Sequence, residues 1–171
     1  SGDNPARYVS INPERYNFVP YFAGEDCELN IPAIKFTDGP SGIVMGYHST
    51  AFPVSIARGA SFDQDLEERI GEVMGIEGRS GGANLCAAIC INVLRHPAWG
   101  RAQETYGEDP CLLGIMGSAL TRGIQKHMMA CVKHFACNSM ENSRFKVSVD
   151  AYERTMREIY LPHFKECVDE G

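Results

Sequence analysis

Charged side chains follow apolar segments at three places in this sequence. Asp38 follows the first segment, Arg95 follows the second, and Lys133 and His134 lie near the end of the third, while Arg144 sits in a polar loop further on. One carboxylate, three cations and a histidine can hold ring hydroxyl groups through charge-assisted hydrogen bonds, which are about twice as strong as neutral ones. Such a set suits a polyol, and it would also suit a phosphate or carboxylate ligand.

Each of these side chains also has a structural interpretation. A turn aspartate such as Asp38 commonly accepts hydrogen bonds from its own backbone. Lys133 could form an ion pair with Asp38 or Glu104, since charges are rarely buried without a partner. Arg144 by itself would be a solvated side chain, and Trp99 could stack on a sugar face or lie in the core.

Other chemical motifs are missing or badly spaced. The sequence contains no glycine-rich phosphate loop of either common spacing and no Gly-x-Ser-x-Gly elbow. Cys131, His134 and Cys137 follow one another at metal-like intervals, but side chains spaced by three along one extended segment cannot all converge on one ion. We therefore expect neither a metal nor an organic cofactor.

Three pairs of segments could position the charged residues, each pair an apolar strand followed by an amphipathic helix. The helices carry apolar residues at three- and four-residue steps. Ser61 or Asp63 can cap the first helix, and Pro110 falls in the first turn of the second. The expected strands are 31–36, 87–94 and 129–135, and the expected helices are 63–78, 110–127 and 150–170.

Alternating strands and helices indicate an α/β fold with a parallel sheet. A doubly wound open sheet and a (β/α)8 barrel both fit that order. Asp38, Arg95, Lys133 and His134 all fall at the carboxyl ends of expected strands, where barrel enzymes assemble their active sites. We therefore expect the first part of a TIM-type (β/α)8 barrel, truncated after about three strand-helix units.

The expected organisation is a lead-in followed by this partial barrel. Residues 1–28 are polar, contain several Pro and Gly residues, and predict an irregular segment, which leaves 29–171 for the barrel units. Three strands cut from a barrel leave an open edge and an uncovered apolar face. The remainder of the barrel, or a second copy in a homo-oligomer, should cover them.

Composition excludes several classes of protein. The 16 basic and 22 acidic residues give a net charge of -6 without long runs, so we expect no nucleic-acid partner. No apolar run approaches the roughly 20 residues of a membrane helix, so we expect no membrane span. The first residues show no secretory signal, and seven cysteines, an odd number, favour reduced thiols and the cytoplasm.

A series of ordered motifs runs through residues 30–171. They are Thr37-Asp38-Gly39-Pro40-Ser41-Gly42, Phe52-Pro53, Arg95-His96-Pro97-Ala98-Trp99-Gly100-Arg101, Glu104-Thr105-Tyr106-Gly107-Glu108-Asp109-Pro110, Gly123-Ile124-Gln125, Lys133-His134-Phe135 and Glu158-Ile159-Tyr160-Leu161. At these motifs and their spacing the sequence resembles glycoside hydrolase family 3, the family of β-glucosidases and β-N-acetylhexosaminidases. The segment 95–110 leans to the β-glucosidase branch.

The resemblance implies a barrel whose pocket binds a terminal sugar through Asp38, Arg95, Lys133, His134 and Arg144. In that pattern Asp38 binds the hydroxyls farthest from the scissile bond, and Lys133 and His134 bind those beside it. Arg95 would bridge the sugar and neighbouring carboxylates. The family acts by retention, with an aspartate nucleophile and a glutamate acid/base about 5 to 5.5 Å apart. No cofactor is implied.

The resemblance places both catalytic carboxylates in later segments, so we expect no catalytic residue in these 171 residues. Glu104, Glu108 and Asp109 are the available carboxylates, and in the family pattern they belong to a structural loop. Val44 departs from the pattern, because many relatives carry an arginine there. The loss of that arginine should reshape one side of the sugar site.

The leading hypothesis is the N-terminal part of a retaining exo-acting β-glycosidase that releases glucose from β-linked oligosaccharides or glycosides. Its partners would be the glycoside substrate, the remainder of the barrel and a following domain. Two alternatives stay open. One is a non-catalytic sugar-binding or scaffold fragment. The other is an unrelated parallel α/β protein for a phosphorylated small molecule, which predicts competition by phosphate.

Overall fold

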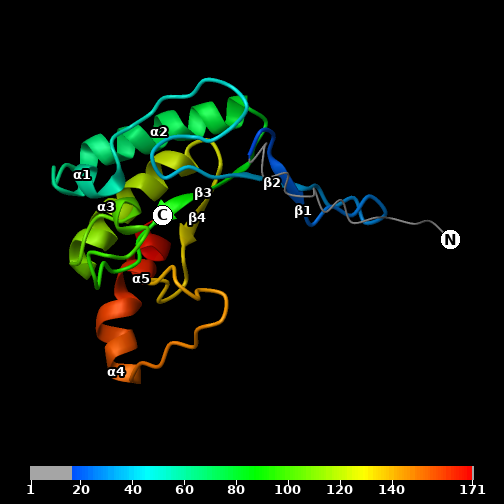
Figure 1. Ribbon diagram of the computed structural model, residues 1–171. Coiled ribbons are helices and arrows are strands. Elements are labelled where there is room, and N and C mark those ends of the chain that lie inside the picture. Colours follow the sequence, from blue (N-terminus) through cyan, green and yellow to red (C-terminus); the bar gives the residue numbers. More distant parts are fainter. Residues whose placement is uncertain (1–16, 171) are drawn as a thin grey trace.

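The computed structural model describes residues 17–170. Figure 1 shows strands backed by helices, with the strand labels running from β1 at the outer end to β4 at the centre. The strands are β1 (Tyr21–Ala23), β2 (Ile34–Thr37), β3 (Leu85–Cys90) and β4 (Met129–Lys133). The helical segments are α1 (Ser55–Gly59), α2 (Gln64–Ser80), η2 (Ala102–Glu104), α3 (Pro110–Gln125), α4 (Glu153–Thr155), η3 (Met156–Tyr160) and α5 (Pro162–Glu170).

The described strands form one sheet in the order β1-β2-β3-β4. β2, β3 and β4 are parallel, with Phe36 opposite Leu85 and Leu85 opposite Met129. α2 connects β2 to β3, and α3 connects β3 to β4. The predicted α/β class and its series of parallel strand-helix units are therefore confirmed.

The first strand was not expected from the sequence. β1 pairs antiparallel with β2, and Tyr21 lies opposite Phe36 with the two ring centres 5.2 Å apart. The lead-in expected to be irregular thus contains one strand, stabilised by this aromatic pair. Figure 1 shows β1 and β2 reaching out to one side, away from the helices. Residues 1–16, the first part of that lead-in, lie outside the described residues.

The two long helices begin where their capping residues predict. Asp63 accepts a hydrogen bond from the backbone N–H of Leu66 at 2.9 Å, and Asp109 accepts one from Cys111 at 3.0 Å. A cap of this kind satisfies N–H groups that the first helical turn leaves unpaired. Asp63, and not Ser61, therefore caps the first helix, and the observed bounds lie within two residues of the predicted ones.

The backbones of α2 and α3 approach each other closely. A methyl group at Gly123 would lie 2.1 Å from the carbonyl oxygen of Glu68, and one at Gly71 would lie 2.6 Å from that of Leu120. Glycine at both positions is what permits the contact. The core between these helices and the sheet consists of fully buried apolar side chains: Met74, Ile89, Ile91, Leu113, Met116, Leu120 and Ile124.

The structure corrects the bounds of four predicted elements. The strand expected over 31–36 is Ile34–Thr37, so it begins three residues later. The strand expected over 87–94 is Leu85–Cys90, so it ends five residues before Arg95. The strand expected over 129–135 ends at Lys133, which makes His134 the first residue after it. The helix expected over 150–170 is interrupted, because Pro162 has no N–H to continue the helical hydrogen bonds. In the turn before it, the Leu161 N–H donates to the Met156 carbonyl at 2.9 Å.

Candidate functional site

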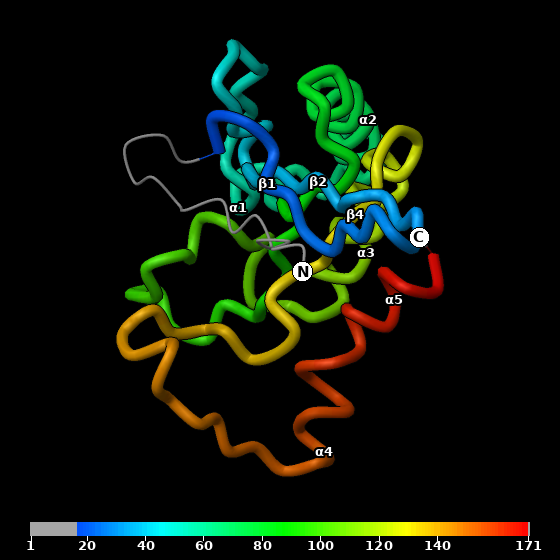
Figure 2. The backbone as a smooth tube through the Cα atoms, turned by 90° about the vertical axis from the view of Figure 1, so that its right-hand side faces the viewer, coloured from blue at the N-terminus to red at the C-terminus, as the bar shows by residue number. Residues whose placement is uncertain are grey.

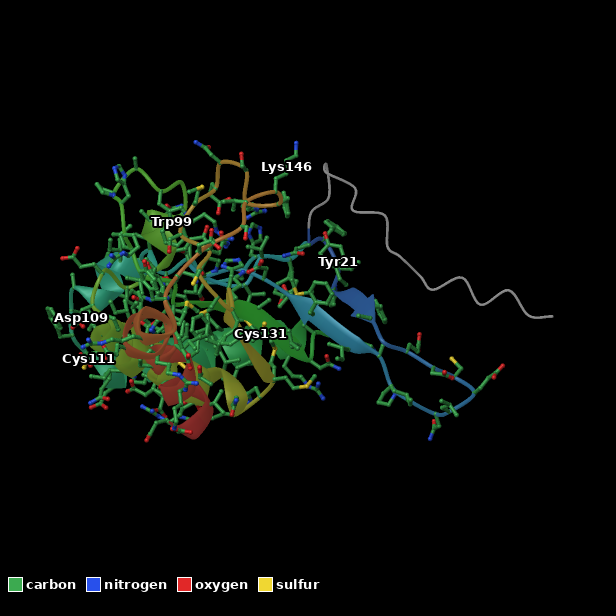
Figure 3. The ribbon with its side chains drawn as sticks, turned by 90° about the horizontal axis from the view of Figure 1, so that it is seen from below. Tyr21, Trp99, Asp109, Cys111, Cys131 and Lys146 are labelled. Carbon is green, nitrogen blue, oxygen red and sulfur yellow. The ribbon has the colours of Figure 1, made fainter. Side chains whose placement is uncertain are left out.

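A pocket of about 570 Å³ opens beyond the carboxyl ends of β2 and β4. Figure 2 shows the loops that follow β3 and β4 running side by side there, and Figure 3 places Trp99 and Lys146 of these loops to one side of Cys131 in β4. The floor is polar and the wall formed by the second loop is largely apolar. The lining residues are Asp38, Arg101, Lys133, His134, Ala136, Cys137, Asn138, Met140, Arg144, Phe145, Val147 and Val149.

Lys133 and Asp38 form an ion pair in this pocket. The Nζ atom of Lys133 lies 2.7 Å from Oδ1 of Asp38, with 11% and 26% of the two side chains exposed. The same Oδ1 atom accepts a hydrogen bond from the backbone N–H of Gly39 at 2.8 Å. The sequence offered Asp38 and Glu104 as partners for Lys133, and the structure selects Asp38. Both members of the pair line the pocket, so pairing does not remove them from the site.

His134 is oriented by the side chain of Asn92. The backbone N–H of His134 donates to Oδ1 of Asn92 at 2.8 Å, and Nδ2 of Asn92 donates to the carbonyl oxygen of His134 at 2.9 Å. Nη1 of Arg101 lies 2.7 Å from Nε2 of His134. Because a guanidinium can only donate, Nε2 accepts and the ring proton is on Nδ1.

The imidazole of His134 is neutral at physiological pH. Burial lowers its pKa to about 4, and the positive charges of Arg101 and Lys133 act in the same direction. A neutral ring can hydrogen-bond a hydroxyl group without adding a charge to the pocket. Asn92 was not anticipated as a site residue, although an amide within an otherwise apolar run is a visible sequence signal.

Arg101 occupies the place in the pocket that the sequence assigned to Arg95. Arg95 is exposed, and its guanidinium carbon lies 5.9 Å from the ring centre of Tyr160, outside the residues that line the pocket. Nε of Arg101 donates to Oε1 of Glu104 at 2.9 Å. Because the preceding strand ends at Cys90, residues 91–100 form a loop. Arg95 lies on the exposed part of this loop, and the chain comes back to the pocket at Arg101. The structure therefore does not bring Arg95 to this pocket.

Arg144 does reach the pocket, from the loop that follows β4. Its Nη1 atom lies 3.0 Å from Oε2 of Glu141, and its guanidinium carbon lies 4.6 Å from the ring centre of Phe145. Of the five residues predicted to bind a ligand, Asp38, Lys133, His134 and Arg144 are thus brought together. Arg101 and Arg144 each pair with a carboxylate three positions away, Glu104 and Glu141, but this spacing also occurs outside the pocket, as at Arg69 and Glu72, so it does not by itself identify Arg101.

The other residues singled out in the sequence have structural contacts. Trp99 is 5% exposed and lies in the core, so it does not offer a stacking surface. Asp109 caps α3 and Glu104 pairs with Arg101. Val44 hydrogen-bonds through its N–H to the Asp38 carbonyl at 2.9 Å and lines a second hollow of about 410 Å³ on the other side of that turn.

A buried ionic cluster supports the turn that carries Asp38. Nε of Arg58 lies 2.9 Å from Oε2 of Glu67, and the hydroxyl of Tyr106 donates to Oε1 of Glu67 at 2.6 Å. Nη1 of Arg58 donates to the carbonyl oxygens of Pro40 and Pro53 at 3.1 and 2.5 Å. The side chains of Arg58, Glu67 and Tyr106 are almost entirely buried. The cluster was not predicted, because it joins residues far apart in the sequence.

Within residues 17–170 no helix is both long and apolar enough to cross a bilayer. The same residues contain no cluster of three or more His, Cys, Asp or Glu side chains that could hold a metal ion. The seven cysteines are all free.

Comparison with known proteins gives consistent matches along the chain. Residues 19–171 match the family model described as the glycosyl hydrolase family 3 N terminal domain. A β-glucosidase from Rhizobium radiobacter is 43% identical over 147 residues, which are 82% of this chain and 18% of that protein. The chain therefore spans less than a fifth of the length of that relative.

Solved structures with the same fold lead to the same family. β-Glucosidase 3B from Thermotoga neapolitana, in complex with α-D-glucose, superposes with a TM-score of 0.86 at 33% identity and covers 91% of this chain and 24% of its own. A β-glucosidase from Streptomyces venezuelae in complex with D-glucose has a TM-score of 0.83 at 35% identity, with coverages of 90% and 20%. The parallel units described above are the first part of the (β/α)8 barrel of this fold.

Proposed function

Because the chain belongs to glycosyl hydrolase family 3, as part of its N-terminal domain, we propose that it forms the sugar-binding part of a retaining, exo-acting β-glucosidase. Asp38, Lys133, His134 and Arg144 bind the terminal sugar, with Arg101 in place of Arg95. The substrate is a terminal β-linked glucose in an oligosaccharide or glycoside. Relatives described as β-glucosidases, two of them with bound glucose, support this assignment.

The observation that carries the proposal is the charge balance of the pocket. Each cation that lines it is paired with a carboxylate: Lys133 with Asp38, Arg101 with Glu104, and Arg144 with Glu141. His134 adds no charge, because its pKa is lowered to about 4. A pocket rich in donors and acceptors but without net charge suits a neutral polyol better than a phosphate.

The pocket contains both donors and acceptors, so it can bond a sugar hydroxyl through its oxygen and through its hydrogen. The cationic N–H groups of Lys133, Arg101 and Arg144 donate to sugar oxygens, and the carboxylate of Asp38 accepts from sugar hydroxyls. Because these bonds involve charged partners in a partly buried pocket, each is stronger than a bond between neutral groups. Rigid support from Asn92 and from the cluster around Arg58 keeps them in position.

The catalytic carboxylates come from elsewhere in the complete protein. Retention requires a nucleophile and an acid/base whose carboxyl groups lie about 5 to 5.5 Å apart. Among the lining residues of this pocket Asp38 is the one carboxylate, and it is engaged with Lys133. The remainder of the barrel and a following domain would supply the pair and cover exposed apolar side chains beside β4, such as Phe135 and Met129.

Two finer points belong to the same proposal. Seven free cysteines, three of them fully buried, suit a reducing compartment such as the cytoplasm. Self-association would be a second way to cover the outer edge of β4. The alternative of a sugar-binding fragment without hydrolysis keeps the same pocket and differs only in turnover.

The test is hydrolysis of a panel of aryl β-glycosides by the complete protein that contains this chain, and by the 171-residue chain alone. We expect the complete protein to release nitrophenol from the β-glucoside and the short chain to be inactive. Glucose should inhibit competitively, and inorganic phosphate should not. Inhibition by phosphate without hydrolysis would favour the phosphate-binding alternative, and glucose binding without turnover would favour the non-catalytic one.

A further inference from the structure

Glu141 lies beside the pocket and contacts the two loops that line it. Its Oε2 atom accepts a hydrogen bond from Nη1 of Arg144 at 3.0 Å. Its Cγ atom lies so close to Gly100 that a methyl group added there would be 3.2 Å away. Gly100 directly precedes Arg101 in the chain. Glu141 therefore joins the loop that carries Arg144 to the loop that carries Arg101, although it does not itself line the pocket.

The charge of Glu141 completes the balance of the site. Asp38 and Glu104 are already paired with Lys133 and Arg101. Glu141 is the partner of Arg144, whose side chain is 36% exposed toward the pocket mouth and solvent. Although burial lowers the pKa of Arg101, the hydrogen bond that it donates to Glu104 and the charges of Glu104 and Glu141 raise it. Without Glu141 the site would carry one uncompensated positive charge.

One oxygen of Glu141 is poorly explained by a role in folding alone. Its Oε1 atom is buried and accepts no hydrogen bond from any residue between 17 and 170. A buried acceptor without a donor is unfavourable, and more so when it belongs to an ionised group. A side chain that only held the loop would not need a full negative charge at this position.

We propose that Glu141 is a positioning and specificity-determining residue that fixes Arg144 beside Arg101 and keeps the pocket electrically neutral. A neutral sugar is thereby favoured over an anionic ligand such as a phosphorylated sugar. The inference rests on the proposed sugar-binding function. It goes beyond that function, because it names the residue that makes the pocket select neutral ligands over anionic ones.

The test compares glucose and inorganic phosphate as ligands of the complete protein by isothermal calorimetry, at constant ionic strength. Glu141→Gln keeps the shape and removes the charge, so it should weaken glucose binding and strengthen phosphate binding, each by about threefold to tenfold for one partly exposed ion pair. Glu141→Asp keeps the charge but shortens the side chain. It should weaken glucose binding while phosphate binding stays as weak as in the wild type.

Glu153→Gln is the matched control, since Glu153 forms an exposed ion pair with Arg157 outside the pocket. It should leave both affinities unchanged. Unchanged phosphate binding in Glu141→Gln would overturn the charge role, and unchanged glucose binding in both Glu141 variants would overturn the positioning role. Wild-type protein that binds glucose without hydrolysing a glycoside contradicts the proposed enzyme but not this inference, whereas wild-type protein that binds no glucose overturns both.

Discussion

Lys133 and Asp38 form their ion pair across the intervening strand β3. Lys133 is the last residue of β4, and Asp38 directly follows β2, 95 positions earlier in the sequence. Because the strands are parallel, their carboxyl ends meet at one edge, and the two side chains converge there. The pair thus links the first and third strand-helix units at the pocket itself.

Asp38→Asn should lower kcat/KM on an aryl β-glucoside by about tenfold to a hundredfold, the range expected for a lost hydrogen bond to a charged group. The amide can still accept one hydrogen bond, but it leaves Lys133 without its counter-charge. Asp169→Asn is the control, because Asp169 is in an exposed pair with Lys165. Steady-state kinetics of the complete protein would contradict the assignment if both variants behaved alike.

Arg101→Ala and Arg95→Ala distinguish the arginine placed in the pocket by the structure from the one suggested by the sequence. Removal of Arg101 leaves Glu104 unpaired and Nε2 of His134 without its donor, so we expect kcat/KM to fall by about a hundredfold. Arg95 is exposed beside Tyr160, and its removal should change kcat/KM less than about threefold. A larger loss of kcat/KM in Arg95→Ala than in Arg101→Ala would mean that Arg95 is the ligand-binding arginine, as the sequence suggested.

The stability of the fold should fall as the pH falls from about 6.5 towards 4. Burial lowers the pKa of His163 to about 4, and burial with two nearby cations does the same for His134. In the unfolded chain both histidines titrate near 6.5, so between these pH values the unfolded state binds more protons and is favoured. Stability is therefore complete above about pH 6.5 and reduced in acid.

His163→Phe isolates the contribution of His163 to this pH dependence. His163 is 1% exposed and its Nδ1 atom has no hydrogen-bond partner in the described part of the chain. The variant should flatten the dependence between pH 4.5 and 7 without abolishing it, because His134 still titrates. Urea unfolding followed by the fluorescence of Trp99, the one tryptophan of the chain, measures it. If the free energy of unfolding changed with pH as steeply as in the wild type, His163 would not contribute to the pH dependence of stability.

Glu67→Gln should destabilise the fold by about 3–5 kcal/mol, because it leaves the buried guanidinium of Arg58 without a counter-charge. Replacement of both partners, Arg58→Met with Glu67→Leu, should recover part of that loss, since no unpaired charge remains although the Pro40 and Pro53 carbonyls and the Tyr106 hydroxyl lose their partners. Tyr106→Phe removes one hydrogen bond to Glu67 and should cost about 1 kcal/mol. The urea midpoints of the three variants give the order of their stabilities. A double variant less stable than Glu67→Gln would contradict the prediction.

Local signals in the sequence were sufficient for most elements of the fold. Asp63 and Pro110 mark the starts of α2 and α3, and the helical spacing of apolar residues gives their lengths. The strand expected over 87–94 was too long because Ile91 and Val93 are buried without belonging to a strand. An apolar run indicates that its residues are buried, but it does not show that they pair with a neighbouring strand. Here strand pairing ends where the Asn92 side chain hydrogen-bonds the backbone N–H and carbonyl groups of His134.

The site could be predicted from the strand pattern only for residues at the ends of strands. Asp38, Lys133 and His134 are such residues, and their convergence follows from parallel strands, whereas Arg144 was named through the family resemblance. Arg101 reaches the pocket at the end of a ten-residue loop, whose path depends on contacts that no local pattern encodes. The Arg58 cluster was missed for the same reason, since its partners are brought together only by the packing of α1, α2 and the segment after η2.

The close contact between α2 and α3 leaves these two helices little freedom to move relative to each other. Gly123 lies against the Glu68 carbonyl, and the side chains of Arg122 and Lys126 form ion pairs with Glu68 across the same contact. The loop after β4 has far fewer ties, among them the hydrogen bond from Oγ of Ser139 to the Val93 carbonyl at 2.8 Å. Because this loop forms much of the pocket lining, we expect changes in the shape of the pocket to come from the loop and not from the two helices, on the nanosecond-to-microsecond timescale of surface loops.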